Sequence, residues 1–329
     1  MDSVTQAVLG ASIGGAIAPR GARRKAILVG AALGTLPDLD VFIDYGGAVE
    51  NFTYHRGFSH SLFVLAPFSV LLWLALRRWW SPVREAPWRW LTLICLALLT
   101  HPLLDAHTAY GTQLFWPLEP HPAMWATLFI IDPLYTLPLL FAVLVAAIRP
   151  LAHFSGRALR AALVISTLYI GWSWVAQGIA RSHVDEALAG MGLEDAPVFL
   201  TPTPFNTLLW RAVVLTEEGY LEGFDSLVLH EGVMHFDAYE SDKEALNAAG
   251  NVWAVQRLRW FSSDFLRATV EDGYLVLADL RMGTEPTYIF THVVARLENP
   301  HWIEEPTELR PVSFSDRALA EVWQRIWSL

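Results

Sequence analysis

The sequence predicts an α-helical multi-pass membrane bundle followed by a C-terminal α+β domain. Hydrophobic residues make up 53% of the 329 residues and charged residues only 17%, and the mean hydropathy is +0.34. In ordinary soluble domains about a quarter of the residues are charged. Many of the fifteen Trp residues lie beside apolar runs, as in the aromatic belts at membrane interfaces. These observations favour a membrane protein.

The distribution of charge divides the chain into two parts. Residues 1–180 carry 12 Lys/Arg and 9 Asp/Glu, whereas residues 181–329 carry 11 and 24. We therefore expect a transmembrane domain over residues 1–180 and an extracytoplasmic α+β domain over residues 181–329. The acidic second part argues against nucleic-acid binding, which requires a basic face.

Four apolar runs are predicted to cross the membrane: Leu62–Leu76, Trp90–Leu104, Leu128–Ile148 and Leu159–Ile179. The last two have the length of roughly 20 residues that a bilayer requires. Two shorter runs rich in Gly and Ala precede them. These runs, Val4–Ala18 and Ala26–Leu36, predict a helical hairpin that packs closely against other helices, and whether the hairpin spans the bilayer is left open.

The basic residues favour one orientation in the cytoplasmic membrane. They cluster in three connections, around Arg20–Lys25, Arg77–Arg89 and Arg149–Arg160. The positive-inside rule places these connections in the cytoplasm. The segments Asp38–His60 and Asp105–Trp125, and the chain after Arg181, are then expected to face outward.

The second part of the chain contains short β-branched and aromatic stretches separated by Gly, Asp or Pro, which is typical of strands. The predicted strands are Thr207–Glu217, Tyr220–Leu229, Val233–Tyr239, Phe265–Glu271, Tyr274–Leu280 and Tyr288–Leu297. Helical apolar spacing predicts helices over Lys243–Phe261 and Ser315–Trp327.

Ionisable side chains gather where apolar runs begin or end, and such residues in membrane segments are usually functional. His101 and Asp105 are four residues apart and share one face of a helix. Nitrogen and oxygen donors of this kind suit a divalent ion. The six candidate ligands come from three predicted outward-facing places and are Asp38, Asp40, His55, His60, His101 and Asp105. Six ligands would suffice for two ions, whereas one catalytic ion needs about three.

Two residues are predicted to take part in the chemistry beside the ion. Arg56 lies between His55 and His60, and its guanidinium is suited to clamp an anionic group; the alternative role is an interfacial anchor. A turn at Gly57 is expected to bring the two histidines together. Asp40 is predicted to act as a general base or, alternatively, to hydrogen-bond a ligand.

Four blocks in this order resemble the YdjM-like membrane-bound metal-dependent hydrolases. The blocks are Asp2-Ser3-Val4-Thr5-Gln6, Gly34-Thr35-Leu36-Pro37-Asp38-Leu39-Asp40, His55-Arg56-Gly57-Phe58-Ser59-His60-Ser61 and His101-Pro102-Leu103-Leu104-Asp105. Ile130–Tyr135 and Thr201–Thr207 look like the longer branch of that family, which adds a C-terminal domain.

The resemblance implies Asp38, His55, His60, His101 and Asp105 as ligands, with Asp40 added to them. The pattern is similar to that of the zinc-dependent phospholipase C and single-strand nuclease group, which hydrolyses phosphoesters. Many relatives have Thr-His where this chain has Thr5-Gln6. Either one metal position is lost in this chain, or Gln6 binds substrate.

The leading hypothesis is therefore a membrane hydrolase that uses one or two divalent ions, with zinc expected, to attack a lipid-like phosphoester at the outer face. The expected partners are the lipid bilayer and a phospholipid or other phosphoester substrate; protein partners are left open. The competing hypothesis is a non-catalytic metal-binding membrane protein, either a transporter or a sensor. A third is a structural assembly protein whose acidic C-terminal domain recruits partners.

Overall fold

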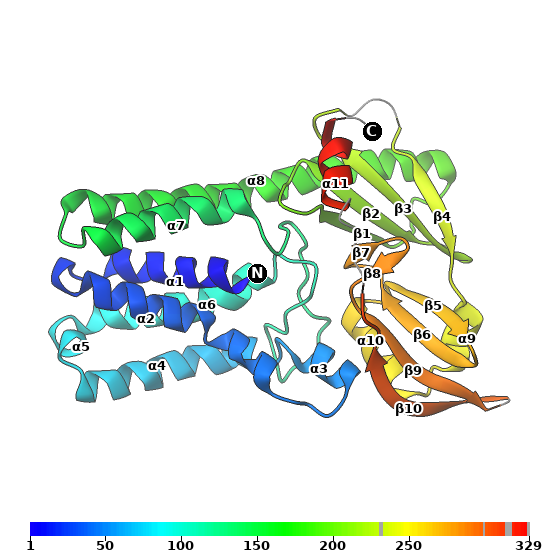
Figure 1. Cartoon of the computed structure of the whole chain (residues 1–329), viewed down its shortest axis with the longest axis horizontal. Helices are drawn as coiled ribbons and strands as arrows, with labels where there is room; N and C mark the ends of the chain where they lie inside the picture. The colour runs from blue at the N-terminus through cyan, green and yellow to red at the C-terminus, as the bar shows by residue number, and fades with distance from the viewer. Residues whose placement is uncertain (230–232, 299, 313–317, 328–329) are drawn as a thin grey trace. The chain divides into compact units, whose positions relative to one another are not determined.

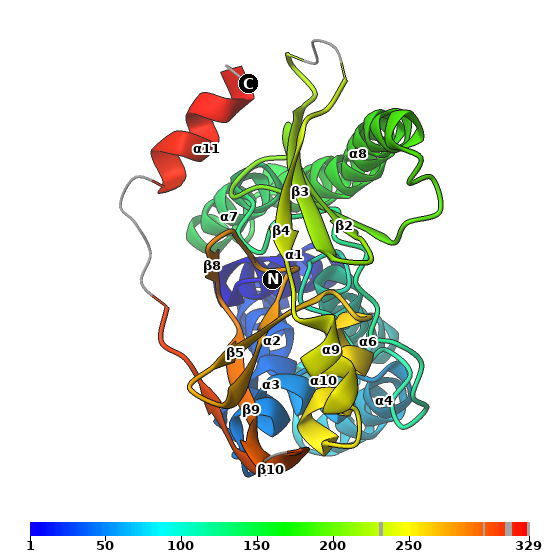
Figure 2. The ribbon, with the colours of Figure 1, turned by 90° about the vertical axis from the view of Figure 1, so that its right-hand side faces the viewer.

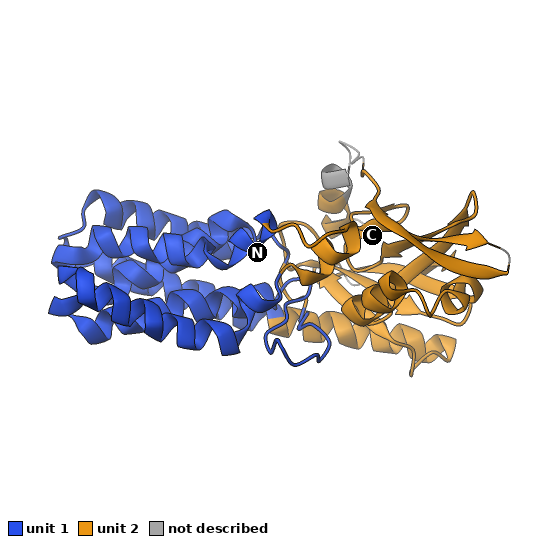
Figure 3. Ribbon diagram, turned by 90° about the horizontal axis from the view of Figure 1, so that it is seen from below, with its two compact units in different colours: residues 1–42, 56–125, 129–173 blue, residues 43–55, 126–128, 174–329 orange. Residues whose placement is uncertain are grey.

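The computed structural model describes residues 1–229, 233–298, 300–312 and 318–327. The chain forms two compact units (Figure 3). Unit 1 comprises Met1–Phe42, Arg56–Trp125 and Phe129–Ser173. Unit 2 comprises Ile43–His55, Ala126–Leu128 and Trp174–Leu329. Two short segments from the first half of the chain therefore belong to unit 2, whereas the sequence assigned all of residues 1–180 to one domain.

Unit 1 consists of helices that lie side by side along its length (Figure 1). The α-helices are α1 (Ser3–Ile17), α2 (Arg23–Thr35), α4 (Leu62–Trp79), α5 (Ser81–Glu85), α6 (Pro87–Asp105), α7 (Pro133–Ile148) and α8 (His153–Met191), and the 3-10 helices are η1 (Arg20–Ala22), η2 (Pro37–Phe42) and η3 (Phe58–His60). Helix α8 contributes to unit 1 up to Ser173 and to unit 2 from Trp174.

Helices α1 and α2 form the predicted close-packed hairpin. A Cβ atom on Gly10 would lie 2.1 Å from the carbonyl oxygen of Gly30, and one on Gly34 would lie 2.4 Å from that of Gln6. Side chains at these positions would force the helices apart, so glycine is required for this approach. The hairpin thereby holds Gln6 against the end of α2, from which the chain enters the candidate site.

Among the described residues, two helices are long and apolar enough to span a bilayer, α4 and α8. Helices α1 and α7 are apolar but shorter. The predicted span Leu128–Ile148 was wrong at its start, because α7 begins at Pro133 and the Asp132 carboxylate caps it by accepting from the N–H groups of Leu134 and Tyr135. The predicted span Trp90–Leu104 lies in α6, which is not one of the two long apolar helices. A multi-pass arrangement therefore stays a prediction.

Unit 2 contains the predicted sheet-rich region. One antiparallel sheet has the strand order β1-β2-β3-β4, a second has the order β10-β9-β6-β5, and β7 pairs with β8. The strands are β1 (Val198–Pro202), β2 (Leu209–Leu215), β3 (Gly219–Ser226), β4 (Phe236–Glu240), β5 (Leu266–Glu271), β6 (Tyr274–Asp279), β7 (Gly283–Thr284), β8 (Thr287–Tyr288), β9 (Thr291–Glu298) and β10 (His301–Leu309). Strands β1 and β10 were missed in the sequence because neither shows a clean alternation of apolar and polar residues.

Four short helices complete unit 2: α3 (Ala48–Tyr54), α9 (Lys243–Ala248), α10 (Trp253–Ser262) and α11 (Ala318–Trp327). The helix predicted over Lys243–Phe261 is two helices, because the chain turns at Gly250. Helices α9 and α10 lie against the second sheet (Figure 2). The C-terminal half of α8 packs Ala180 and Val184 with Trp210 of the first sheet. The first part of the helix predicted over Ser315–Trp327 lies outside the described residues.

Candidate metal centre

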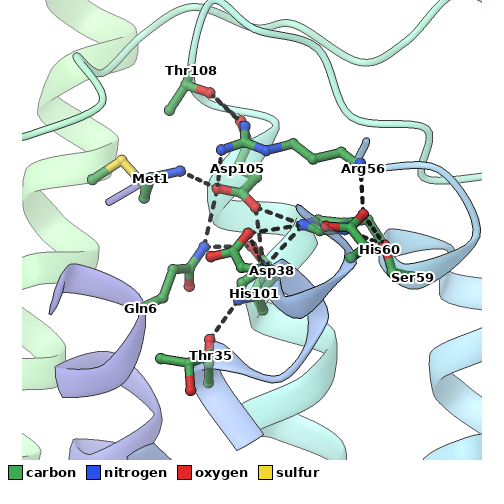
Figure 4. A network of polar contacts seen from close by, with 12 residues as sticks. Met1, Gln6, Thr35, Asp38, Arg56, Ser59, His60, His101, Asp105 and Thr108 are labelled. Carbon is green, nitrogen blue, oxygen red and sulfur yellow. Dashed lines mark hydrogen bonds and ion pairs between the residues drawn. The ribbon is translucent and has the colours of Figure 1, made fainter. Parts of the chain in front are cut away.

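Four ionisable side chains of unit 1 converge at one point (Figure 4). Asp38 comes from η2, His60 ends η3, and His101 and Asp105 lie one turn apart at the end of α6. One donor atom from each lies within 4.8 Å of those of the other three. The predicted i, i+4 pairing of His101 and Asp105 therefore does place both side chains on the same face of α6.

Each of the five donor separations that involve a histidine nitrogen is 3.1–3.4 Å. The Nε2 atoms of His60 and His101 are 3.1 Å apart. Asp105 Oδ2 lies 3.2 Å from both of these nitrogens, and Asp38 Oδ1 lies 3.4 Å from both. His60, His101 and Asp105 are fully buried, whereas the Asp38 side chain is 17% exposed. Solvent therefore meets the cluster at Asp38.

The carbonyl oxygen of Gly34 orients His101. It lies 2.6 Å from His101 Nδ1, close enough to accept the proton of that nitrogen. With Nδ1 protonated, Nε2 presents its lone pair to the cluster, which is the tautomer that a metal requires. Gly34 also allows α2 to approach Gln6. The same residue therefore serves both the packing of the hairpin and the orientation of the His101 imidazole.

His60 is oriented by a relay through Ser59. The Ser59 hydroxyl donates to Asp40 Oδ2 at 2.5 Å, and its oxygen lies 2.9 Å from His60 Nδ1. This leaves the Nε2 lone pair of His60 toward the cluster. Asp40 is not one of the four clustered residues, and its Oδ2 lies 3.8 Å from His60 Nδ1, on the far side of the ring. Asp40 therefore lies behind His60, as its alternative predicted role requires, and direct ligation of an ion by Asp40 stays a prediction.

His55 is also outside the four-residue cluster. It is the C-cap residue of α3 and belongs to unit 2, whereas the cluster belongs to unit 1. The spacing of five residues between His55 and His60 did not indicate one helical face, and the structure shows why. Only Arg56 and Gly57 separate His55 from the start of η3, and neither belongs to a helix.

The turn between α3 and η3 includes Arg56 as well as the predicted Gly57. Arg56 has a φ of 59°, in the left-handed region that non-glycine residues rarely occupy. Its backbone N–H donates to Asp40 Oδ2 at 3.0 Å. Its buried guanidinium lies 3.4 Å from Asp105 Oδ1 and donates to Thr108 Oγ1 at 3.2 Å. Arg56 therefore holds the carboxylate oxygen of Asp105 that points away from the histidines.

Gln6 and Met1 contact the same carboxylate (Figure 4). The Gln6 Nε2 amide donates to Asp105 Oδ1 and to the His101 carbonyl oxygen, both at 3.1 Å. The Met1 amino group also donates to Asp105 Oδ1. Gln6 Oε1 and Asp105 Oδ2 are buried and accept no hydrogen bond from the described residues. Both oxygen atoms therefore keep lone pairs that hydrogen bonds from the described residues do not use.

The electrostatics of the cluster favour the ionised carboxylate. In the metal-free chain a proton on Nε2 lets His101 and His60 hydrogen-bond to Asp38, and these bonds outweigh burial and hold the pKa of Asp38 below its usual value. Two imidazole lone pairs and two carboxylate oxygens facing one another repel unless a cation or proton lies between them. The donor set therefore fits a divalent metal ion, with Asp38, His60, His101 and Asp105 able to hold it.

The residues that orient the ligands were not assigned roles from the sequence. Ser59 and Gly34 both lie in the blocks singled out there, but a lone serine or glycine shows no periodicity. Ser59 immediately precedes the candidate ligand His60. A hydroxyl next to a candidate ligand was the one sequence signal that could have predicted this orienting role.

Unit 1 is thus a helical unit that carries a largely buried cluster of His and Asp side chains able to hold a metal ion. A family model described as YdjM inner membrane protein matches residues 1–180. This match covers more than half of the chain, and the chain belongs to that family. The family description supports localisation in the inner membrane.

Two relatives are similar to parts of the chain. Inner membrane protein YbcI of Escherichia coli (strain K12) is 32% identical over 114 residues, which are 34% of this chain and 64% of that protein. The chain thus spans less than two thirds of YbcI. The uncharacterized protein YfhP of Bacillus subtilis (strain 168) is 24% identical over 230 residues, 68% of each chain. No solved structure matches the chain.

Proposed function

We propose that the chain is a metal-dependent hydrolase of the inner membrane that cleaves a phosphoester bond in a lipid-like substrate. One observation carries this proposal: four nitrogen and oxygen donors of unit 1 lie within 4.8 Å of one another, and the five separations that involve a histidine nitrogen are 3.1–3.4 Å. The resemblance to membrane-bound metal-dependent hydrolases supports the same reading.

We propose zinc as the ion and one ion per chain. Ligands about 2.0 Å from a tetrahedral zinc ion lie about 3.3 Å from one another, which agrees with the five separations of 3.1–3.4 Å that involve a histidine nitrogen. An octahedral magnesium ion would place adjacent ligands closer, at about 2.9 Å. The six ligands expected for two ions are not assembled, since Asp40 and His55 lie outside the cluster.

A bound ion would lower the pKa of a coordinated water and polarise the phosphoester. The remaining tasks belong to the side chains. His60 and His101 are held as lone-pair donors by Ser59 and by Gly34. Arg56 balances the charge of Asp105 and adds positive charge for an anionic group. Asp40 keeps the Ser59 relay in place. We further propose that the cluster and unit 2 face the outside of the membrane.

A second candidate function also has an observation in its favour. Catalytic zinc sites keep one position open, whereas structural sites are closed by four protein ligands. Here four donors surround the centre, and three of them are fully buried. The alternative is therefore a membrane protein that binds a metal ion without catalysis.

Metal analysis of the purified protein separates the two candidates. We expect about one zinc ion per wild-type chain from the single donor set, and none in His101→Ala or Asp105→Ala. His153→Ala is the matched control, because this imidazole is exposed and lies in unit 1 outside the cluster. Phosphoester hydrolysis, screened with lipid and nucleotide substrates, should be lost with the metal.

The outcomes are distinct. Metal binding in the wild type without turnover of any substrate favours the non-catalytic alternative. Unchanged metal content in both variants would refute both candidates.

A further inference from the structure

Basic side chains gather at the end of unit 1 where α1 connects to α2 and α7 connects to α8 (Figure 1). Hydrogen bonds join the two connections, since Arg24 donates to the carbonyl oxygens of Ala147 at 2.9 Å and of Ile148 at 3.2 Å. Helices α1, α2 and α7 and residues 153–184 of α8 contain no Asp or Glu. The basic residues in and beside the two connections are Arg20, Arg23, Arg24, Lys25, Arg149, Arg157 and Arg160.

Arg23 is the buried member of this group, with only 5% of its surface exposed. Its Nε donates to the Gly15 carbonyl oxygen at 3.1 Å, and its Nη1 donates to the carbonyl oxygens of Pro150 and Ala152. Its Nη2 donates to none of the described residues, and Arg23 forms no ion pair with any of them. Neutral carbonyl oxygens satisfy hydrogen bonds but do not balance the charge of a buried guanidinium.

A second guanidinium approaches Arg23 beside Gly156 of α8. A Cβ atom on Gly156 would lie 2.8 Å from Arg23 Nη2 and 3.9 Å from Arg160 Nη1, so both nitrogens lie within 4 Å of one point. The charges of Arg20 and Arg160 repel that of Arg23. Gly156 is the fourth residue of α8, at the end where the helix dipole favours an anion. Paired guanidinium groups of this kind are suited to bind phosphate oxygens.

Large apolar side chains are exposed in and beside the same connections. Leu28, Ile148 and Leu151 are 67–71% exposed, and Phe154 is 47% exposed. A free inorganic anion would have no use for such neighbours, whereas a phospholipid places acyl chains directly beside its phosphate. Because the chain belongs to an inner membrane family, the combination of unpaired cations and exposed apolar side chains favours a lipid head group as the occupant.

We propose that Arg23, Arg160 and Gly156 form a binding site for the phosphate of an anionic phospholipid. The phosphate oxygens would accept from Arg23 Nη2 and Arg160 Nη1, and the absence of a side chain on Gly156 leaves space for them. Gln6, near the start of α1, contacts the metal cluster, whereas Gly15, near the end of α1, holds Arg23. The two sites therefore lie at opposite ends of this helix. The lipid is a bound partner rather than a substrate, and the inference depends on neither metal binding nor hydrolysis.

Native mass spectrometry of the full-length protein in detergent, titrated with phosphatidylglycerol, tests this proposal. Phosphatidylcholine, in which choline cancels the charge of the phosphate, should bind more weakly. We expect Arg160→Gln to weaken phosphatidylglycerol binding about fivefold, the loss expected for one basic residue at an anionic lipid. Gly156→Ala keeps the net charge but places a methyl group against Arg23 Nη2, and a similar loss is expected. Arg89→Gln is the matched control, because Arg89 is exposed on α6, outside both connections.

Equal phosphatidylglycerol binding by the wild type, Arg160→Gln and Gly156→Ala overturns the inference. An equal loss in Arg89→Gln also overturns it, because general attraction to positive charge would then be sufficient. Inorganic phosphate at the same concentration should not displace the lipid, and full displacement would contradict the lipid assignment. Arg160 is exposed and forms no ion pair with the described residues, so Arg160→Gln keeps the test decisive should Gly156→Ala fail to fold.

Discussion

Two buried carboxylates of unit 2, Asp279 and Glu222, lie directly against arginine side chains, whereas the buried Asp105 carboxylate of the His/Asp cluster in unit 1 also faces two imidazole nitrogens. In unit 2, Arg281 Nη2 lies 2.5 Å from Asp279 and Arg211 Nη2 lies 2.5 Å from Glu222. In unit 1, Arg56 lies 3.4 Å from one oxygen of Asp105, and the other oxygen of Asp105 faces two histidines.

This comparison distinguishes two kinds of buried charge. One kind is paired within the chain and stabilises the fold, and the other is suited to bind a ligand. An acid paired with a guanidinium has its hydrogen bonds satisfied within the chain. An acid facing imidazole lone pairs does not, and desolvation makes that arrangement unfavourable unless a cation completes it. Burial alone does not identify a site, since both units bury charges. The chemistry of the facing partner does.

The largest expected effect comes from breaking a complete pair in unit 2. Arg281→Ala removes the guanidinium from the buried Asp279 carboxylate and leaves the backbone N–H of residue 281 as its donor, and both side chains are nearly inaccessible to solvent. We expect the free energy of unfolding to fall by about 3–5 kcal/mol, as for other broken buried pairs. Denaturant unfolding followed by circular dichroism measures this. The double variant Asp279→Leu/Arg281→Met should recover part of the loss, and a single variant as stable as wild type would contradict the comparison.

A smaller effect is expected from a buried histidine of unit 2 that has no acid directly opposite it. Burial lowers the pKa of His292 to about 4, despite the nearby Asp279. The unfolded state, with a pKa of about 6.5, then binds the proton first. Stability should therefore be constant above that pH and fall as the pH drops from about 6.5 toward 4. Thermal unfolding of wild type and His292→Phe across this range measures the effect, and parallel pH profiles would show the assignment to be wrong.

The smallest effect is expected at the edge of the metal cluster. Gln6→Leu removes the two hydrogen bonds that the amide donates to Asp105 and to the His101 carbonyl. We expect zinc affinity to fall about tenfold, because such supporting contacts orient the ligand. Ser12→Ala on the same helix is the control, since its buried hydroxyl has no hydrogen-bond partner among the described residues. Chelator competition measures both, and equal weakening in both variants would argue against a specific role for Gln6.

Local sequence pattern was sufficient for several features. The i, i+4 spacing of His101 and Asp105 predicted a shared helical face, and the small residues of the first hairpin predicted its close packing. Asp132 before Pro133 indicated a helix start, although the longer apolar run that includes it suggested a span beginning earlier. In each case the physical signal lies within a few residues of the chain.

The local sequence did not predict which candidate ligands in the loops would join the cluster. Asp38 and Asp40 are one residue apart, yet one faces the imidazole Nε2 atoms and the other lies behind His60. The left-handed backbone at Arg56 separates His55 from His60. Which side of an irregular turn a side chain takes depends on contacts distant in sequence, such as the hydrogen bond from Gln113 to Arg56.

The sequence by itself determined the class of protein, the acidic sheet-containing second part and a short set of candidate ligands, because composition and helical periodicity are local properties. Only the tertiary structure decided which four of six candidates meet, how Gly34 and Ser59 set the imidazole tautomers, and that α3 belongs to unit 2. Those outcomes depend on packing between segments far apart in the chain, where hydrogen-bond geometry and burial select one arrangement that no local pattern encodes.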